Sequence, residues 1–208
     1  MIYTLVKLFS KLFLGFGGNP TIVGLENIPQ AGPIVVVANH SSLLDAFLLV
    51  SFWPQRITFL SSAYLFKLPG VGAFLRSVGA ISVQNGGNNL AGIRSALQVL
   101  RCGNTLALFP EGRIYQLNNL GPFHSGWAHF ALKAGASVVQ VVIKGTGSML
   151  PLGAVFPRRS PIFVQIAVPW TIEKTISPLA ETLSVMNTRL SEQMDEILSG
   201  MPDSAGGR

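Results

Sequence analysis

The sequence contains one cysteine, Cys102, and three histidines among its 208 residues. A single cysteine excludes an internal disulfide framework and any all-cysteine metal site, and three histidines leave little material for a zinc cluster. A chain of this length suffices for one domain with a sizeable core, but it is short for two full domains. We therefore expect one domain and assign no residue to a metal ion.

Charged residues are also scarce, at 12% of the chain against 49% apolar residues. This balance excludes disorder, because the apolar surface is large enough to offset chain entropy. Residues 1–172 contain only three acidic residues, Glu26, Asp45 and Glu111, against twelve Lys and Arg, whereas residues 173–208 contain six acidic and three basic residues. A basic, apolar body predicts an anionic partner, which is a membrane surface, a phosphate-bearing substrate or an acidic carrier protein. Nucleic acid is not expected, because the basic residues are scattered and no nucleic-acid-binding signature occurs.

No segment offers the run of about 18 uninterrupted apolar residues that a spanning helix needs. The first 16 residues instead predict an amphipathic helix, with Leu, Phe, Ile and Val on one face and Thr4, Lys7 and Lys11 on the other. Such a helix is suited to the interface of a bilayer. The alternative is an ordinary helix whose apolar face packs on the domain. A cleaved signal peptide is disfavoured, because Lys11 interrupts the apolar stretch.

From residue 20 onward, β-branched runs alternate with amphipathic segments. Strands are expected at 34–38, 57–60, 80–83, 105–109, 138–143 and 162–168, and helices at 41–51, 90–102, 125–133 and 177–198. Residues 64–78 predict two short helical pieces broken at Pro69-Gly70, and 84–89 predict a turn. This alternation is typical of a single α/β domain with a mostly parallel or mixed sheet flanked by helices.

A histidine and a carboxylate lie five residues apart where a predicted strand passes into a helix. His40 follows the strand and Asp45 lies in the first turns of the helix. A carboxylate that binds one imidazole nitrogen fixes the tautomer and leaves the other nitrogen to act as a general base. On its own this spacing arises readily by chance, so the pair is a weak motif.

The second polar group is Phe109-Pro110-Glu111-Gly112-Arg113, directly after a predicted strand. Ligands in α/β proteins bind at the carboxyl ends of strands. Glu111 is suited to hold a substrate hydroxyl or to organise the site, and Arg113 to pair with a phosphate. When these residues are considered alone, an ordinary surface turn is the favoured interpretation, because Pro-Glu-Gly is a common turn sequence.

Four segments, taken in order, resemble one family. They are NHSSLLDAF (39–47), YLFKLPGVGAFLRSVGAISV (64–83), FPEGR (109–113) and SGWAHFALKAGASVVQVVI (125–143). The His-x4-Asp and Phe-Pro-Glu-Gly motifs, with 71 residues from His40 to Glu111, are similar to those of glycerolipid acyltransferases, the family of the lysophosphatidic acid acyltransferases. The resemblance covers roughly residues 20–170.

The resemblance implies transfer of a fatty acyl group from acyl-coenzyme A or acyl carrier protein to the free hydroxyl of lysophosphatidic acid, which forms phosphatidic acid. His40, oriented by Asp45, would deprotonate the hydroxyl. The backbone N–H groups of Ser41 and Ser42, or those around Gly112, would stabilise the oxyanion. No cofactor, metal ion or covalent enzyme intermediate is required. The thioester is a co-substrate.

Glu111, Gly112, Arg113 and Lys67 are the candidate substrate-binding residues. The family's second block usually ends in an arginine that contacts the acceptor phosphate, but residues 79–85 (GAISVQN) contain none. Phosphate binding would then fall on Arg113, Lys67 or Lys144, and a different lysolipid remains open as the acceptor. A thioesterase or lipid hydrolase that uses the same histidine to activate water is the competing enzyme, and an inactive lipid-binding protein is the competing non-enzyme.

Three segments follow from these expectations. Residues 1–19 are predicted to form a membrane-association helix, residues 20–200 the acyltransferase domain, and residues 201–208 a frayed tail. The protein is expected to lie on the cytoplasmic face of a membrane, attached without crossing it, with an anionic bilayer and either thioester donor as its partners.

Overall fold

A seven-stranded sheet forms the centre of the computed structural model, which describes residues 2–83, 89–115, 119–172 and 179–202. The strand order is β1-β7-β6-β2-β5-β3-β4, and every neighbouring pair is parallel except β6 and β7. The strands are β1 (Thr21–Val23), β2 (Ile34–Ala38), β3 (Ile57–Ser62), β4 (Ile81–Val83), β5 (Thr105–Leu108), β6 (Ser137–Lys144) and β7 (Phe163–Ile166). The predicted α/β domain with a mostly parallel sheet is confirmed.

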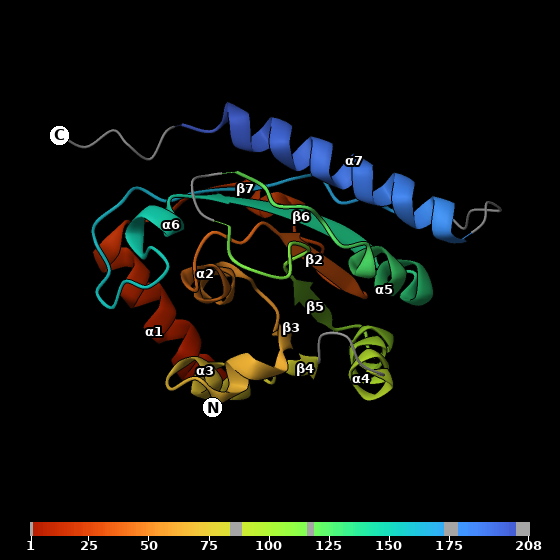
Figure 1. The fold of residues 1–208 in the computed structure, drawn as a ribbon, viewed down its shortest axis with the longest axis horizontal. Coiled ribbons are helices and arrows are strands. Elements are labelled where there is room, and N and C mark those ends of the chain that lie inside the picture. Colours follow the sequence, from red (N-terminus) through yellow and green to blue (C-terminus); the bar gives the residue numbers. More distant parts are fainter. Residues whose placement is uncertain (1, 84–88, 116–118, 173–178, 203–208) are drawn as a thin grey trace.

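Helices cover both faces of the sheet (Figure 1). One face carries α1 (Ile2–Gly17), α2 (Leu44–Phe52) and α3 (Val71–Ser77), and the other carries α4 (Leu90–Arg101), α5 (Gly126–Ala134) and α7 (Leu179–Gly200). The short helix α6 (Thr146–Met149) follows β6, and 3-10 turns occur at η1 (Leu25–Asn27) and η2 (Ala63–Lys67). The chain thus forms three layers, helices–sheet–helices.

The central strand β2 shows how the sheet separates two cores. Ile34, Val36 and Ala38 pack on the α1–α3 side, whereas Val35 and Val37 pack on the α4–α5–α7 side. All five residues are buried. A strand covered on both faces is expected to be continuously apolar, and this is why its sequence was recognisable as a buried strand.

The helix predicted to begin at Ser41 begins at Leu44 instead. Residues 41–43 form a turn around the carboxylate of Asp45, which accepts the backbone N–H groups of Ser41 and Ser42. Those amides point at a side chain, so they are not part of the helix. The other predicted strands and helices agree to within a few residues, and β1 and α6 are additions that the apolar pattern did not predict.

Three predictions fall wholly or partly outside the described residues. These are the turn that includes Gln84 and Asn85, the start of the helix predicted from Ser177, and most of the tail at 201–208.

Helix α1 packs on the domain mainly with residues beside its main apolar face, together with Val6 and Phe13 from one edge of that face. Ser10 and Leu14 are buried, and the amine of Lys7 donates a hydrogen bond to the backbone carbonyl of Trp53. Tyr3 is half-buried, and its hydroxyl accepts the N–H of Ile57 at 3.0 Å. The side chains that point outward are Ile2, Leu5, Leu8, Phe9, Leu12 and Phe16, which are between 54% and 82% exposed. The alternative in which this face packs on the domain is therefore wrong for most of its residues.

Lys7 was expected on the solvated face and lies against the domain instead. Its desolvation, with a smaller effect from Lys11, lowers the pKa of the Lys7 amine below its ordinary value. Within the described ranges, no helix has both the length and the apolar content that crossing a bilayer requires.

Candidate active site

The predicted histidine and carboxylate meet at the carboxyl end of β2. His40 Nδ1 lies 3.0 Å from Asp45 Oδ2. This oxygen already accepts the N–H groups of Ser41 at 2.8 Å and Ser42 at 2.9 Å. Because a carboxylate oxygen can only accept a hydrogen bond, this contact assigns the proton to Nδ1 and leaves the lone pair on Nε2. The side chain of His40 is 13% exposed, and that of Asp45 is completely buried.

The second oxygen of Asp45 is held by a residue far away in the sequence. Thr146, the first residue of α6, donates its hydroxyl to Asp45 Oδ1 at 2.5 Å. Ser41 Oγ lies 2.9 Å from the same hydroxyl. Thr146 is fully buried. A buried carboxylate is costly unless it is well bonded, so these contacts are what allow Asp45 to stand in the core beside His40.

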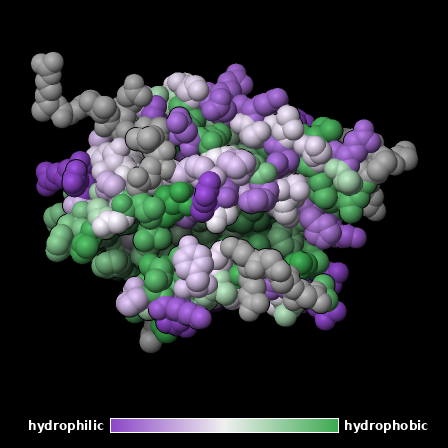
Figure 2. All heavy atoms as spheres, viewed as in Figure 1, coloured by the Kyte–Doolittle hydropathy of each residue, from purple (hydrophilic) through white to green (hydrophobic). Residues whose placement is uncertain are grey.

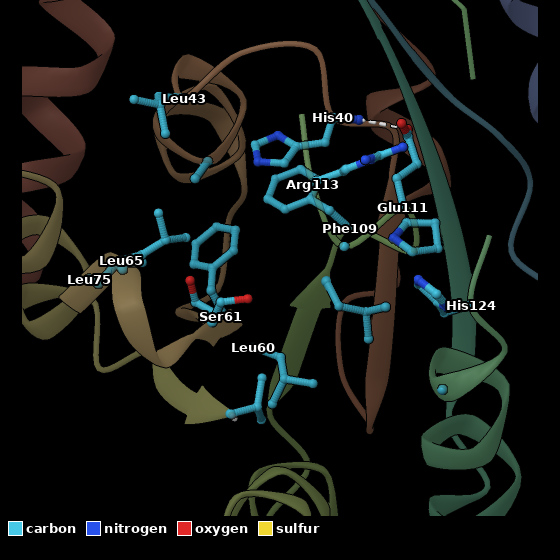
Figure 3. Close-up of a pocket in the computed structure, with 18 of the residues that line it drawn as sticks. His40, Leu43, Leu60, Ser61, Leu65, Leu75, Phe109, Glu111, Arg113 and His124 are labelled. Carbon is cyan, nitrogen blue, oxygen red and sulfur yellow. Dashed lines mark hydrogen bonds between the residues drawn. The ribbon is translucent and has the colours of Figure 1, made fainter. Parts of the chain in front are cut away.

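Glu111 fixes the backbone around the histidine. Its Oε1 accepts the N–H of His40 at 3.0 Å, the contact drawn as a dashed line in Figure 3, and its Oε2 accepts the N–H of Gly121 at 3.2 Å. Burial raises the pKa of the Glu111 carboxyl above its ordinary value, and the two amides act in the opposite direction. Both contacts fit the organising role considered for Glu111.

Asn39 joins β2 to β6 just before the histidine. Its side chain donates to the carbonyl of Ile143 at 2.8 Å and accepts the N–H of Ile143 at 2.7 Å. The side chain therefore continues the sheet pairing beyond the point where the two backbones separate. It keeps the turn that carries His40 beside the turn that carries Thr146.

His40 borders a cavity of about 980 Å³, within the size range of small-molecule sites. The ring of His40 stacks on Phe109 with centroids 3.9 Å apart and an interplanar angle of 12°. Figure 3 shows His40 and Arg113 at one end of this space, and Leu60, Ser61, Leu65 and Leu75 around the rest. Most of the lining is apolar and comes from Leu43, Ala46, Phe47, Phe59, Leu60, Leu65, Val71, Phe74, Leu75, Val83, Leu108, Phe109, Trp127 and Phe130.

The structure brings Glu111, Gly112 and Arg113 to this cavity together with His40. Gly112 has φ +67, in the left-handed region that favours glycine, and this allows the chain to turn away from β5. The guanidinium of Arg113 lies over the ring of Tyr115, 4.6 Å from its centroid. Arg113 is the only Lys or Arg among the described residues that line the cavity.

The structure does not bring the two candidate lysines to this cavity. Lys67 is exposed on η2 and does not line it. Lys144 is buried at the end of β6, where its amine donates to the carbonyl of Met201 at 3.0 Å.

The backbone amides expected to stabilise an oxyanion are already in use. Those of Ser41 and Ser42 bind Asp45, and that of Gly112 binds the carbonyl of Phe109 at 3.1 Å. The expectation for these three groups is corrected accordingly. The arrangement places three features at one cavity: a histidine with a fixed tautomer, the guanidinium of Arg113 and an apolar lining. Arg113 lies 73 positions after His40 in the sequence.

Sequence reasoning missed Thr146, which binds Asp45. It also missed Ser61 and Ser62, which line the cavity. Parallel neighbouring strands end at the same edge of a sheet, and β2 pairs in parallel with β6. Thr146, an early polar residue after β6, was therefore detectable once these two strands were known to be neighbours. The sequence does not reveal that pairing.

Comparisons with known proteins agree with the fold. A family model described as Acyltransferase matches residues 19–144. The chain resembles the crystal structure of the 1-acyl-sn-glycerophosphate (LPA) acyltransferase PlsC from Thermotoga maritima with a TM-score of 0.77 and 26% identity. The match covers 97% of this chain and 81% of that one.

Curated relatives carry the same kind of name. The chloroplastic 1-acyl-sn-glycerol-3-phosphate acyltransferase BAT2 of Brassica napus is 32% identical over 136 residues, which are 64% of this chain and 39% of that protein. The 1-acyl-sn-glycerol-3-phosphate acyltransferase of Borreliella burgdorferi is 25% identical over 172 residues, with 79% of this chain and 67% of that protein covered. The match thus spans about two fifths of the plant relative's length.

Proposed function

The chain belongs to the acyltransferase family, and from this premise we propose that it transfers a fatty acyl group from a thioester to the free hydroxyl of lysophosphatidic acid. The product is phosphatidic acid, and the donor is acyl-coenzyme A or acyl carrier protein. The proposal rests above all on His40 Nδ1 lying 3.0 Å from Asp45 Oδ2 at the wall of an apolar cavity. The names of the relatives supply the substrate class.

His40 Nε2 is the proposed general base. With Nδ1 donating to Asp45, Nε2 accepts the proton of the acceptor hydroxyl as the oxygen attacks the thioester carbonyl. A C–O bond forms, the C–S bond breaks, and the departing sulfur takes the proton back from Nε2. Asp45 stays ionised throughout and stabilises the transient imidazolium. The histidine supplies both proton transfers, so the reaction needs no metal ion, cofactor or acyl-enzyme intermediate.

The cavity gives each part of the substrates a matching surface. Apolar walls such as Phe74, Leu75 and Phe130 suit a fatty acyl chain, because each buried CH₂ contributes about 0.8 kcal/mol. Arg113 is the proposed partner of the acceptor phosphate, since a guanidinium binds phosphate oxygens in a bidentate manner. Glu111 holds His40 and the loop after β5 in place through its two amide contacts, and it also lines the cavity.

Helix α1 is proposed to attach the protein to the cytoplasmic face of an anionic membrane. Its exposed face includes Leu5, Phe9, Leu12 and Phe16, all at least 59% exposed, and Lys11 is exposed on the same helix. An apolar helix face with flanking basic residues is suited to lie in the interfacial region of a bilayer. The rest of α1 packs on α2 and α3, so this attachment would hold the whole domain against the lipid.

A product screen by mass spectrometry tests the proposal. The purified protein is incubated with a panel of lysolipids in vesicles and with either acyl-coenzyme A or acyl carrier protein. We expect phosphatidic acid from lysophosphatidic acid with at least one donor. Release of free fatty acid without an acylated lipid would overturn the proposal in favour of a thioesterase or hydrolase. Acylation of a different lysolipid alone would keep the reaction and correct the acceptor.

A further inference from the structure

The loop after α6 carries apolar side chains outward in the same manner as α1. We propose that this segment, residues 150–159 (the 150–159 loop), is a second membrane-contact element, with its apolar side chains in the bilayer interface and its two arginines on anionic lipid headgroups. The inference goes beyond the proposed function, which places the attachment on α1 alone, and it rests on the membrane association proposed there.

Exposure and charge in the loop support a lipid partner. Leu152, Val155 and Phe156 are 62%, 82% and 81% exposed, and Arg158 and Arg159 follow them and are also exposed. A phenylalanine and a valine side by side in water forgo the favourable burial of their apolar surface. No acidic residue occurs in the sequence between Glu111 and Glu173. The loop therefore offers apolar side chains beside positive charge with no acidic residue along the segment.

The loop lies against the C-terminal end of α1. The N–H of Ser160 donates to the carbonyl of Gly17 at 3.1 Å, and a Cβ on Gly18 would lie 2.2 Å from the carbonyl oxygen of Ser160. Phe16, at 82% exposed, directly precedes these glycines. Figure 1 shows the loop beside the end of α1, and Figure 2 shows hydrophobic residues gathered on that same side of the molecule. The two elements therefore lie next to each other at the end of α1.

The backbone of the loop is fixed, so the exposure of its side chains is built into the fold. Arg158 donates its N–H to the carbonyl of Met149 at 2.7 Å, and Ala154 donates to Pro151 at 3.0 Å. Ser42 Oγ donates to the carbonyl of Leu150 at 2.9 Å. A loop held at both ends presents Val155 and Phe156 at low entropic cost on binding.

The loop is also joined to the catalytic carboxylate. Thr146, at the start of α6, binds Asp45, and Leu150, just past the end of the same helix, binds Ser42. Contact of the loop with lipid thus places the catalytic turn at a fixed distance from the surface that holds the acceptor. This geometry predicts that the loop matters most when the acceptor is presented in a bilayer.

Charge favours a bilayer over a second copy of the chain. In a symmetric dimer formed through this face, Arg158 and Arg159 would meet the same basic surface on the partner. Anionic lipid headgroups neutralise these charges instead, and basic residues near such a surface gain affinity from it. The excess of basic over acidic residues in residues 1–172 acts in the same direction.

Vesicle flotation of the full chain tests the proposal. The variant V155S/F156S should bind vesicles of phosphatidylcholine with 30% phosphatidylglycerol roughly tenfold more weakly than the unaltered chain. The variant R158A/R159A should lose a similar factor on these vesicles and little on pure phosphatidylcholine. The matched control is V168S/V185S, which changes two residues that are 70% and 63% exposed on β7's C-terminal side and on α7. This control should bind as the unaltered chain does.

Equal binding by V155S/F156S and the unaltered chain overturns the proposal, even if substitutions on α1 abolish binding. Analytical ultracentrifugation without vesicles tests whether a second copy of the chain covers this face instead of a bilayer. A dimer that V155S/F156S converts to a monomer, with vesicle binding unchanged, would assign the face to self-association and overturn the proposal too. A monomer in both cases, with weakened flotation of the variant, supports it.

A second assay separates this inference from the proposed function. With a short-chain lysolipid below its critical micelle concentration, V155S/F156S should retain the turnover of the unaltered chain. With the acceptor in vesicles, its turnover should fall about tenfold. Loss of turnover in both formats would show damage to the site and contradict a surface role. If the unaltered chain produces no acylated lipid in either format, the proposed function fails, and flotation still decides the membrane contact.

Discussion

The turn that carries His40 and the outer face of α1 depart from the usual placement of side chains in opposite directions. Around His40, a carboxylate at 0% exposure stands in the core. On α1, phenylalanine and leucine side chains face outward while the Lys7 amine is directed to the domain. The buried carboxylate has a donor on each oxygen, whereas the exposed apolar face is covered by no described residue.

The difference between these two regions indicates which kind of partner each one requires. A buried charge persists only if the protein itself supplies its partners, and the chain supplies them to both oxygens of Asp45. A large exposed apolar patch is stabilised only by something outside the chain. The substitutions below test this contrast, beginning with the largest expected effect.

Replacement of His40 by alanine should lower turnover about 100- to 10,000-fold, because general base catalysis contributes that much. The chain should remain folded, because Asp45 Oδ2 keeps the amides of Ser41 and Ser42 when the imidazole is removed. Turnover is measured as acylated lipid by mass spectrometry. His129→Ala, a histidine on α5 outside the cavity lining, is the control and should keep its activity. A fully active His40→Ala variant would refute the general-base role.

Two leucines on α1 allow a matched comparison of the buried and exposed faces. Leu14 is 1% exposed and Leu12 is 59% exposed. Leu14→Ala should lower the free energy of unfolding by about 2–5 kcal/mol. Leu12→Ala should change it by less than about 0.5 kcal/mol but weaken vesicle binding several-fold. Urea unfolding and flotation measure the two quantities. Equal losses of stability would mean that α1 packs differently from the arrangement described.

Thr146→Val should lower kcat about tenfold with little change in KM, because the hydroxyl acts on Asp45 and not on substrate. It should also cost about 1–3 kcal/mol of stability, since one carboxylate oxygen loses its partner in a buried position. Thr146→Ser restores the hydroxyl and should recover most of the activity. Steady-state kinetics and urea unfolding provide the measurements. A rise in KM alone would contradict a positioning role.

Glu111→Gln should have its clearest effect on the pH dependence of stability. Burial raises the pKa of the Glu111 carboxyl in the folded chain above its ordinary value, which the unfolded chain is expected to have. The folded chain then binds more protons than the unfolded chain between those two pKa values. The contribution of this carboxyl to the free energy of unfolding is therefore fully present below the pKa of the unfolded chain. It is lost as the pH rises through the pKa of the folded chain. Urea unfolding across this range should be less pH-dependent in the variant, and an unchanged slope would contradict the shifted pKa.

Much of the fold was predictable from local patterns. The buried strand 34–38 and the helix 90–102 were recognisable because apolar runs and amphipathic periodicity reflect burial directly. The start of α2 was predicted three residues early. Local propensity does not include the hydrogen bonds that the amides of Ser41 and Ser42 donate to the Asp45 carboxylate, and these bonds keep both residues out of the helix.

The candidate site was predictable only in part. His40, Asp45, Glu111 and Arg113 belong to motifs that are short in sequence, so the printed residues suffice to find them. Thr146 is 101 residues away from Asp45, and no local signal connects the two. For α1 the sequence predicted an apolar face, but its orientation depends on which side chains fit against α2 and α3.

The sequence by itself determined the residue types and their short spacings: an imidazole five positions before a carboxylate, a Pro-Glu-Gly turn after a strand, and an amphipathic first helix. The tertiary structure decided which of these groups meet and which remain uncovered. The physical reason is that β2, β5 and β6 lie side by side although they come from distant parts of the chain. Only their pairing places the buried carboxylate among its donors, and only the packing of α1 leaves its apolar face outward.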